Sequence, residues 1–355
     1  MESTFTTSDG IKLYTKTWKP QVASSIHLIF VHGFSDHVNA YYALFPTLAS
    51  PPYNITVHGF DQRGWGRSAP KKSDWGVTSG THQVLSDIAE YISQISSSIT
   101  TGEQSSTLFL MGHSMGGAES LMYVLSDPKS FSVTPSKPSL PISGLLLESP
   151  HIGFPPQSKP NSLVVLAGRL AAKVAPRFQM VQELDASFMS RDPQVCRDWE
   201  EDPLCHDTGT LEGLAGLLDR ANYLNAFGET GNARSDMRHT LPCPVWWAHG
   251  TADKVCDFDS SRKLYDRLIA NDQTSNAAKQ SRFVAYEGAY HKLHGEPDGV
   301  GEKFARDAAD WMLQIADIDS FQSTDSTSTR GESFAATAGT ASTSAGGAED
   351  VRSKL

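Results

Sequence analysis

Short apolar runs alternate with amphipathic stretches along most of the chain. Several runs are apolar on both faces and end at polar or glycine residues, as buried parallel strands do. They cover residues 26–31, 55–57, 108–111, 145–147, 245–248 and 282–286. Helical stretches fall between several of them, over residues 82–97, 116–125, 260–270 and 299–315. This alternation predicts an α/β fold with a mostly parallel, doubly wound sheet and helices on both faces.

Two further segments frame this predicted core. Asp9-Gly10 separates two alternating segments near the N-terminus and predicts an antiparallel hairpin whose glycine has a positive φ. No strand is expected between residues 150 and 239, where residues 161–175 carry apolar side chains at helical spacing. The sequence therefore predicts a core of residues 1–149 and 240–318. A helical cap, residues 150–239, is expected over the carboxyl ends of the strands, where such sheets bind ligands.

The composition changes beyond the predicted core. Ser, Thr, Ala and Gly dominate residues 320–347, and such a segment cannot bury enough apolar surface to order itself. Residues 319–355 are therefore expected to form a disordered tail. The tail ends in Ser353-Lys354-Leu355, a peroxisomal address that an import receptor reads. A peroxisomal location is expected, with the cytoplasm or the lipid-droplet surface as the alternative.

Composition narrows the function classes. The net charge is −10 and no basic stretch interrupts it, so nucleic acid is not an expected partner. An acidic surface does not attract anionic membranes, so any membrane contact should be apolar and local. The four cysteines form no C-x-x-C pair and are expected to be free thiols in a reducing compartment. Neither a secretory signal nor a membrane span is expected.

A nucleophile motif lies where a strand meets a helix. Residues 112–116 read G-H-S-M-G, and this pattern between a strand and a helix places its serine on a sharp, strained turn. The two glycines avoid a Cβ clash in that turn, and the helix N-terminus presents its positive dipole end. Ser114 is therefore the predicted nucleophile of an acyl-transfer reaction.

Acyl transfer also needs two N–H donors aimed at the oxyanion. The backbone amide of Met115, directly after the nucleophile, is the first expected donor. The second usually comes from a loop after an early strand, and His32-Gly33 follows the first predicted parallel strand. Gly33 allows a close backbone approach, so the amide of Phe34 is the expected second donor.

A serine hydroxyl needs a neighbouring base to take its proton. In this kind of fold the chain order is serine, acid, histidine. His291 follows the last predicted strand in a short loop and is the expected base, with His294 as the alternative. His249 is too early, because it ends the strand that should supply the acid.

The acid should orient the imidazole from the end of that same strand. Asp253 is the expected acid, because the segment 250–253 follows the strand of residues 245–248 at its carboxyl end. Asp257 and Asp259 lie close by and are expected to be solvated or to cap the next helix. Glu148, at the end of an earlier strand, is the less favoured substitute.

With these residues placed, the chain resembles the monoacylglycerol lipases of fungi and animals, which are serine hydrolases of the α/β-hydrolase fold. The matching segments are residues 32–37, 61–68, 112–117, 250–257 and 286–294. The last of these matches selects His291 over His294. Cap segments at residues 190–193 and 202–205 also resemble the fungal members, whereas the tail does not belong to the shared pattern.

The resemblance implies hydrolysis of a monoacylglycerol to fatty acid and glycerol, with no cofactor and no metal. The cap would form an apolar acyl channel, with Leu163, Leu166 and Leu170 as substrate-binding residues, and would make a transient membrane or lipid-droplet contact. Cys256 is expected near this pocket as an inert thiol.

Other functions stay open beside this one. They are an esterase or thioesterase for another acyl substrate, such as one of secondary metabolism, an acyltransferase, and a non-catalytic ligand-binding relative. The complete set of Ser114, Asp253 and His291 counts against the last of these.

Overall fold

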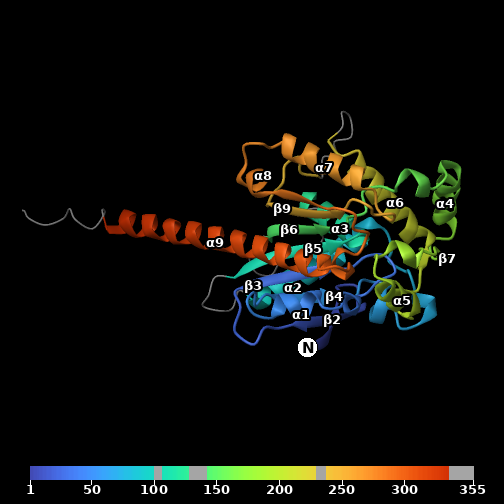
Figure 1. Ribbon diagram of the computed structural model, residues 1–355, viewed down its shortest axis with the longest axis horizontal. Helices are drawn as coiled ribbons and strands as arrows, with labels where there is room; N and C mark the ends of the chain where they lie inside the picture. Colours follow the sequence, from blue (N-terminus) through green and yellow to red (C-terminus); the bar gives the residue numbers. More distant parts are fainter. Residues whose placement is uncertain (100–105, 128–141, 229–236, 336–355) are drawn as a thin grey trace, which may run out of the picture. The chain divides into compact units, whose positions relative to one another are not determined.

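The computed structural model describes residues 1–99, 106–127, 142–228 and 237–335, with side chains up to residue 319. The chain divides into two compact units, Met1–Ala316 and Asp317–Leu355. The main sheet and the cap lie in the first unit (Figure 1).

A single eight-stranded sheet runs through the first unit in the order β1-β2-β4-β3-β5-β6-β9-β10. Its strands are β1 (Glu2–Thr6), β2 (Lys12–Trp18), β3 (Ile26–Val31), β4 (Thr56–Phe60), β5 (Thr107–His113), β6 (Ile142–Glu148), β9 (Val245–Gly250) and β10 (Arg282–Tyr286). β2 pairs antiparallel with both β1 and β4. The remaining neighbours in the sheet pair parallel. The predicted opening hairpin is confirmed, and Gly10 has φ +86° at its turn.

Helices cover both faces of this sheet, because its strands are apolar on both sides. The helices that flank the sheet are α1 (Leu44–Ala49), α2 (Thr81–Ile99), α3 (Met115–Leu125), α7 (Phe258–Ala270), α8 (Asn276–Gln280) and α9 (Val300–Ala335). Successive residues of β3 point to opposite faces. Ile29 joins a core cluster with Ile88 of α2, and Phe30 joins a second cluster with Phe304 of α9. The predicted α/β architecture is therefore confirmed.

The cap lies between β6 and β9 in the chain. It contains α4 (Ser162–Val174), α5 (Pro193–Glu201) and α6 (Leu211–Asn225), together with two short strands, β7 (Gln179–Val181) and β8 (Thr208–Thr210). These strands pair antiparallel with each other, so the prediction of a cap without strands is wrong. Three-residue strands are too short to show a sequence period, and they pair across a long stretch of chain.

Single turns of 3-10 helix complete the first unit. They are η1 (Val38–Ala40), η2 (Gly66–Ser68), η3 (Lys72–Asp74), η5 (Pro156–Ser158), η6 (Ala186–Phe188) and η7 (Leu293–Gly295). η1 follows the loop after β3, and η7 lies just beyond His291.

A buried ion pair fixes the cap to the core. Arg220 of α6 donates to Glu119 of α3 at 2.7 Å, and both side chains are almost fully buried. Burial raises the pKa of Glu119 to about 6, although the Arg220 charge lowers it. Leaving one member of such a buried pair uncompensated is strongly destabilising. The pair therefore ties α6 to the helix that begins at the nucleophile motif.

The last helix extends further than the sequence predicts. Its helical backbone continues to Ala335, which differs from the disordered tail expected from residue 319 onward. Residues 316–335 contain no proline and a single glycine, so nothing in the backbone chemistry stops the helix there. Residues 336–355, with the C-terminal tripeptide, lie outside the described residues. Within the described ranges, no helix has the length and apolar composition that a bilayer crossing requires.

Candidate active site

Ser114 occupies the sharp turn between β5 and α3. Its backbone has φ +54° and ψ −118°, a conformation that L-residues rarely adopt. A Cβ on Gly116 would lie 2.3 Å from the Val31 carbonyl oxygen, and one on Gly112 would lie 2.3 Å from the Gly116 oxygen. These glycines therefore let the turn pack directly against the end of β3, as the motif predicts.

The predicted acid and base meet above the sheet. Asp253 follows β9, His291 follows β10, and His291 Nδ1 lies 2.8 Å from Asp253 Oδ2. The other carboxylate oxygen accepts the amides of Val255 at 2.8 Å and Cys256 at 3.0 Å. Since Nδ1 is engaged by the carboxylate, Nε2 is the nitrogen that can take the proton of a serine hydroxyl.

The electrostatics of this pair favour an ionised acid. Burial alone would raise the pKa of Asp253, but His291 and His249 hold that pKa far below its ordinary value. The carboxylate thus stays charged at neutral pH and can stabilise the imidazolium that forms during proton transfer.

Cys256 links the nucleophile to the acid-base pair. The Ser114 hydroxyl lies 3.9 Å from Cys256 Sγ. Cys256 Sγ, a carboxylate oxygen of Asp253 and a ring nitrogen of His291 all lie within 4.8 Å of one another. Burial and the Asp253 charge raise the pKa of the Cys256 thiol well above its ordinary value, so it is a neutral thiol. The three predicted catalytic side chains therefore gather around one buried sulfur atom.

The predicted oxyanion donors flank the nucleophile. A Cβ on Gly33 would lie 3.1 Å from Ser114 Cβ, so this loop approaches the serine as closely as a glycine allows. Among the described residues, the Phe34 amide donates to no other group. Met115 is the first residue of α3, where an amide has no partner within its helix. Both amides can therefore donate to a developing oxyanion.

The cap holds the oxyanion loop in place. Ser35, the residue after Phe34, has a positive φ of +52°. Its carbonyl oxygen accepts the Trp199 indole N–H at 3.0 Å, and its hydroxyl accepts the Asp207 amide at 2.8 Å. Both partners belong to the cap, so the cap stabilises a strained residue next to an oxyanion donor.

The alternatives to the triad have other partners. His294 lies 2.7 Å from Glu148 through Nδ1, and both side chains are fully buried. Asp257 accepts the Ser260 amide and caps α7, and Asp259 lies in the first turn of that helix. Sequence reasoning missed one contact, which is that between His249 and the acid. His249 Nε2 lies 3.1 Å from Asp253 Oδ2. A histidine four residues before the acid, at the end of a buried strand, is the signal for it.

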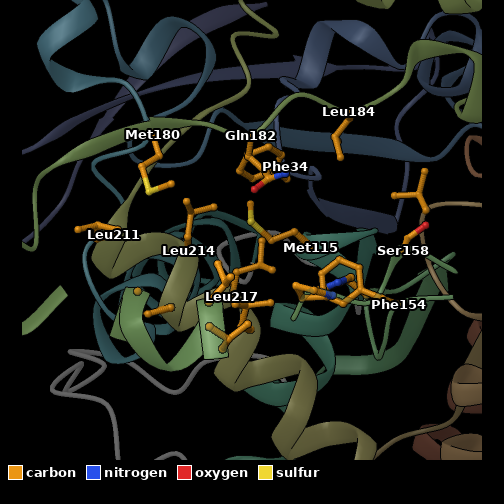
Figure 2. Close-up of a pocket in the computed structure, with 18 of the residues that line it drawn as sticks. Phe34, Met115, Phe154, Ser158, Met180, Gln182, Leu184, Leu211, Leu214 and Leu217 are labelled. Carbon is orange, nitrogen blue, oxygen red and sulfur yellow. The ribbon is translucent and has the colours of Figure 1, made fainter. Parts of the chain in front are cut away.

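A cavity of about 270 Å³ opens at Ser114 between the core and the cap. We call it the Ser114 cavity. Figure 2 shows the side chains of Phe34, Met115 and Phe154 gathered around it, with Leu214 and Leu217 of α6 completing the wall. None of its lining residues is an aspartate or a glutamate. The cavity therefore suits an uncharged, apolar group attached to the reacting carbonyl.

The predicted substrate-binding residues of α4 do not line this cavity. Leu163, Leu166 and Leu170 are exposed, with 75%, 54% and 57% of their surface accessible. Val165 and Arg169 of the same helix face the cavity instead. Helical periodicity identifies an apolar face but does not say whether that face meets a cavity or the solvent.

A second group of metal-type ligands lies beside the oxyanion loop. Atoms of His37, Asp202 and Cys205 lie within 4.8 Å of one another, with His37 Nε2 2.9 Å from Asp202. The Lys292 ammonium close to this group is paired with Asp36 at 2.9 Å, so the two charges balance. Burial raises the pKa of Cys205 far above its ordinary value, which disfavours the thiolate that a metal needs.

A strained serine at a strand-to-helix turn, a buried Asp–His pair and two amide donors define a serine hydrolase of the α/β-hydrolase fold. The sequence model of the family described as serine aminopeptidase, S33, matches residues 24–298.

Curated relatives cover most of the chain. A putative monoglyceride lipase of Schizosaccharomyces pombe is 30% identical over 306 residues, which is 85% of this chain and 71% of the relative. The monoglyceride lipase of Mus musculus is 28% identical and covers 86% of this chain and 88% of its own. The chain belongs to the monoglyceride lipase family of α/β hydrolases.

A solved structure shares the fold. A soluble variant of monoglyceride lipase from Saccharomyces cerevisiae matches with a TM-score of 0.73 at 23% sequence identity. The match covers 89% of this chain and 94% of that one.

We expect Gly116→Ala to destabilise the protein strongly, because the new Cβ would collide with the backbone oxygens of Val31 and His32. Its unfolding free energy should fall by about 3 kcal/mol. Gly168→Ala is the matched control. Gly168 lies in α4, and a Cβ there would meet no atom within 4 Å. That variant should gain about 0.5–1 kcal/mol. Urea unfolding measures both, and equal stability of the two variants would contradict the packing of the turn.

Proposed function

We propose that the protein hydrolyses monoacylglycerols to fatty acid and glycerol through an acyl-enzyme on Ser114. The observation that carries this proposal is the buried Asp253–His291 pair beside a serine that opens into an apolar cavity. The relatives support the substrate class, since they are a putative monoglyceride lipase and a monoglyceride lipase.

The reaction follows from the geometry in two halves. His291 removes the Ser114 proton as the serine attacks the ester carbonyl, and the amides of Phe34 and Met115 bind the oxyanion. The imidazolium, held by Asp253, then protonates the leaving alkoxide. Water repeats the attack on the acyl-enzyme and releases the fatty acid.

The charge of the cavity favours an acyl chain over a peptide. A peptide with a free amino terminus would need a carboxylate to bind its ammonium group, and the lining of the Ser114 cavity contains none. Arg169, the charged residue of that lining, would repel such a group. Apolar side chains such as Leu214 and Leu217 instead match the methylene groups of a fatty acyl chain.

An apolar surface on the cap supports a contact with the lipid that holds the substrate. Val174 is 88% exposed, Leu163 is 75% exposed, and Phe178 lies close to them in the chain and is also exposed. Single exposed apolar residues need no explanation, but a set of them on one segment marks an interaction surface. We propose that this segment, residues 163–181, inserts into the lipid surface from which the cavity draws its substrate.

A substrate panel tests both proposals. The purified protein should hydrolyse monoacylglycerols faster than acyl-CoA thioesters and short nitrophenyl esters, and added alcohol should not divert the product to a new ester. Replacing Leu163 and Val174 together by serine should lower the rate on vesicle-borne monoacylglycerol only.

Ser114→Ala is the control and should abolish every activity while the thermal midpoint stays within a few degrees. Faster turnover of thioesters, or ester synthesis with an added alcohol, would identify a thioesterase or an acyltransferase instead. Equal rates of the double variant on vesicles and on dispersed substrate would contradict the lipid contact.

We further propose that the protein is imported into peroxisomes through Ser353, Lys354 and Leu355. The support is the sequence of this tripeptide alone. A fluorescent protein fused in front of the full chain should accumulate in peroxisomes of fungal cells. The same fusion without the last three residues should stay in the cytoplasm, and an unchanged distribution would contradict the proposal.

A further inference from the structure

His151 is a buried residue of the cavity wall that the proposed reaction does not use. It follows β6 after Ser149 and Pro150, and its backbone N–H donates to the Ser114 carbonyl oxygen at 2.9 Å. The residue is only 5% exposed, and it lines the Ser114 cavity together with Ser114 and Met115. The chain thus places an imidazole next to the nucleophile, separate from the catalytic one.

The ring of His151 has no polar partner in the described part of the chain. It packs edge-on against the Phe154 ring, with 4.6 Å between the centroids. Its nitrogens are not among the fully enclosed side-chain atoms that lack a partner, so they face the open space of the cavity instead of packed protein. A side chain held in this way is expected to meet a polar group that enters the cavity.

The imidazole is neutral at physiological pH. Burial lowers the pKa of His151 to about 4, and the nearby charges of His291 and Arg220 lower it further, against the opposing effect of Asp253. A neutral imidazole offers one donor and one acceptor. It can therefore bind a hydroxyl or a carbonyl oxygen, but it is not a charged anchor for a carboxylate or a phosphate.

The surroundings of His151 make such a contact selective. Most of the cavity lining is apolar and includes Phe34, Met115, Phe154 and Leu217, and its other polar side chains are those of Ser114, Ser158, Arg169 and Gln182. An unsubstituted acyl chain leaves the imidazole unpaired, whereas an oxygen-bearing chain satisfies it. Sites that bind a substrate oxygen in this way reject the analogue that lacks it more strongly than apolar sites distinguish chain lengths.

We propose that His151 selects acyl esters that carry a hydroxyl or oxo group within the first few carbons of the carbonyl. The selection rests on the proposed ester hydrolysis at Ser114 and specifies its acyl group. The short range follows from the backbone hydrogen bond that holds His151 against Ser114. A hydroxyl of the leaving glycerol has the same chemistry, so the experiment has to separate the two sources.

The test compares glyceryl and methyl esters of four acids of equal chain length. The acids are dodecanoic, 3-hydroxydodecanoic, 3-oxododecanoic and 12-hydroxydodecanoic acid. With either leaving group, kcat/KM for the 3-substituted chains should exceed that for dodecanoate by about tenfold, the value of one neutral hydrogen bond. The terminal hydroxyl should give no gain.

Variants assign the preference to the imidazole. In His151→Phe, kcat/KM for the 3-hydroxy ester should become nearly equal to kcat/KM for the plain ester. The plain ester should still be hydrolysed. His151→Gln, which keeps a donor and an acceptor, should retain part of the preference. His239→Phe makes the same chemical change at an exposed position and should leave the ratio as in the wild type.

The outcomes separate this inference from the proposed function. A wild-type ratio near one, with normal hydrolysis of plain esters, overturns the role of His151 and leaves the ester hydrolase standing. A His151→Phe effect on the glyceryl-to-methyl ratio instead overturns the inference by moving the contact to glycerol. No hydrolysis of any ester overturns both.

Discussion

The hydrogen bond between His291 Nδ1 and Asp253 Oδ2 is the contact on which the site depends. The carboxylate is fully buried, and an ionised group away from water costs several kcal/mol unless it is well paired. Two backbone amides and two imidazoles supply that pairing. The fold brings the partners together because β9 and β10 are parallel neighbours whose carboxyl ends open at one edge of the sheet.

The residues of this constellation were predictable from sequence because each follows a recognisable strand. Ser114 lies in a motif between a strand and a helix, and Asp253 and His291 follow runs of buried residues. Chain order then excluded most of the other histidines. The position of the expected oxyanion loop was predictable for the same reason, since the loop of Phe34 follows β3 directly.

Other features depend on partners that only the folded chain brings together. His249 pairs with Asp253, and His294 pairs with Glu148. Neither pair produces a periodic pattern of residues in the sequence. The strands β7 and β8 are too short to be recognised, and the side of α4 that faces the Ser114 cavity follows from its packing beside α6. For His294, the two short strands and α4, the deciding information is a contact between segments distant in the chain, whereas His249 and Asp253 are only four residues apart.

The cap supports the site and also shapes its substrate cavity. Trp199 and Asp207 hold the strained residue after Phe34, while Arg220 is paired with the helix that begins after the nucleophile. Loops near a reacting centre are usually the mobile parts of an enzyme, and here buried polar contacts restrain them. The cap thus both restrains the expected oxyanion loop and supplies part of the wall of the Ser114 cavity.

The most direct measurement is the acylation rate of Asp253→Asn with a nitrophenyl ester under single-turnover conditions. An amide in place of the carboxylate can present its N–H group to Nδ1, which favours the tautomer whose Nε2 carries the proton and cannot act as base. We predict a loss of about 10⁴-fold in that rate with the thermal midpoint shifted by only a few degrees. Acylation within tenfold of the wild-type rate would contradict the central role of the Asp253–His291 bond.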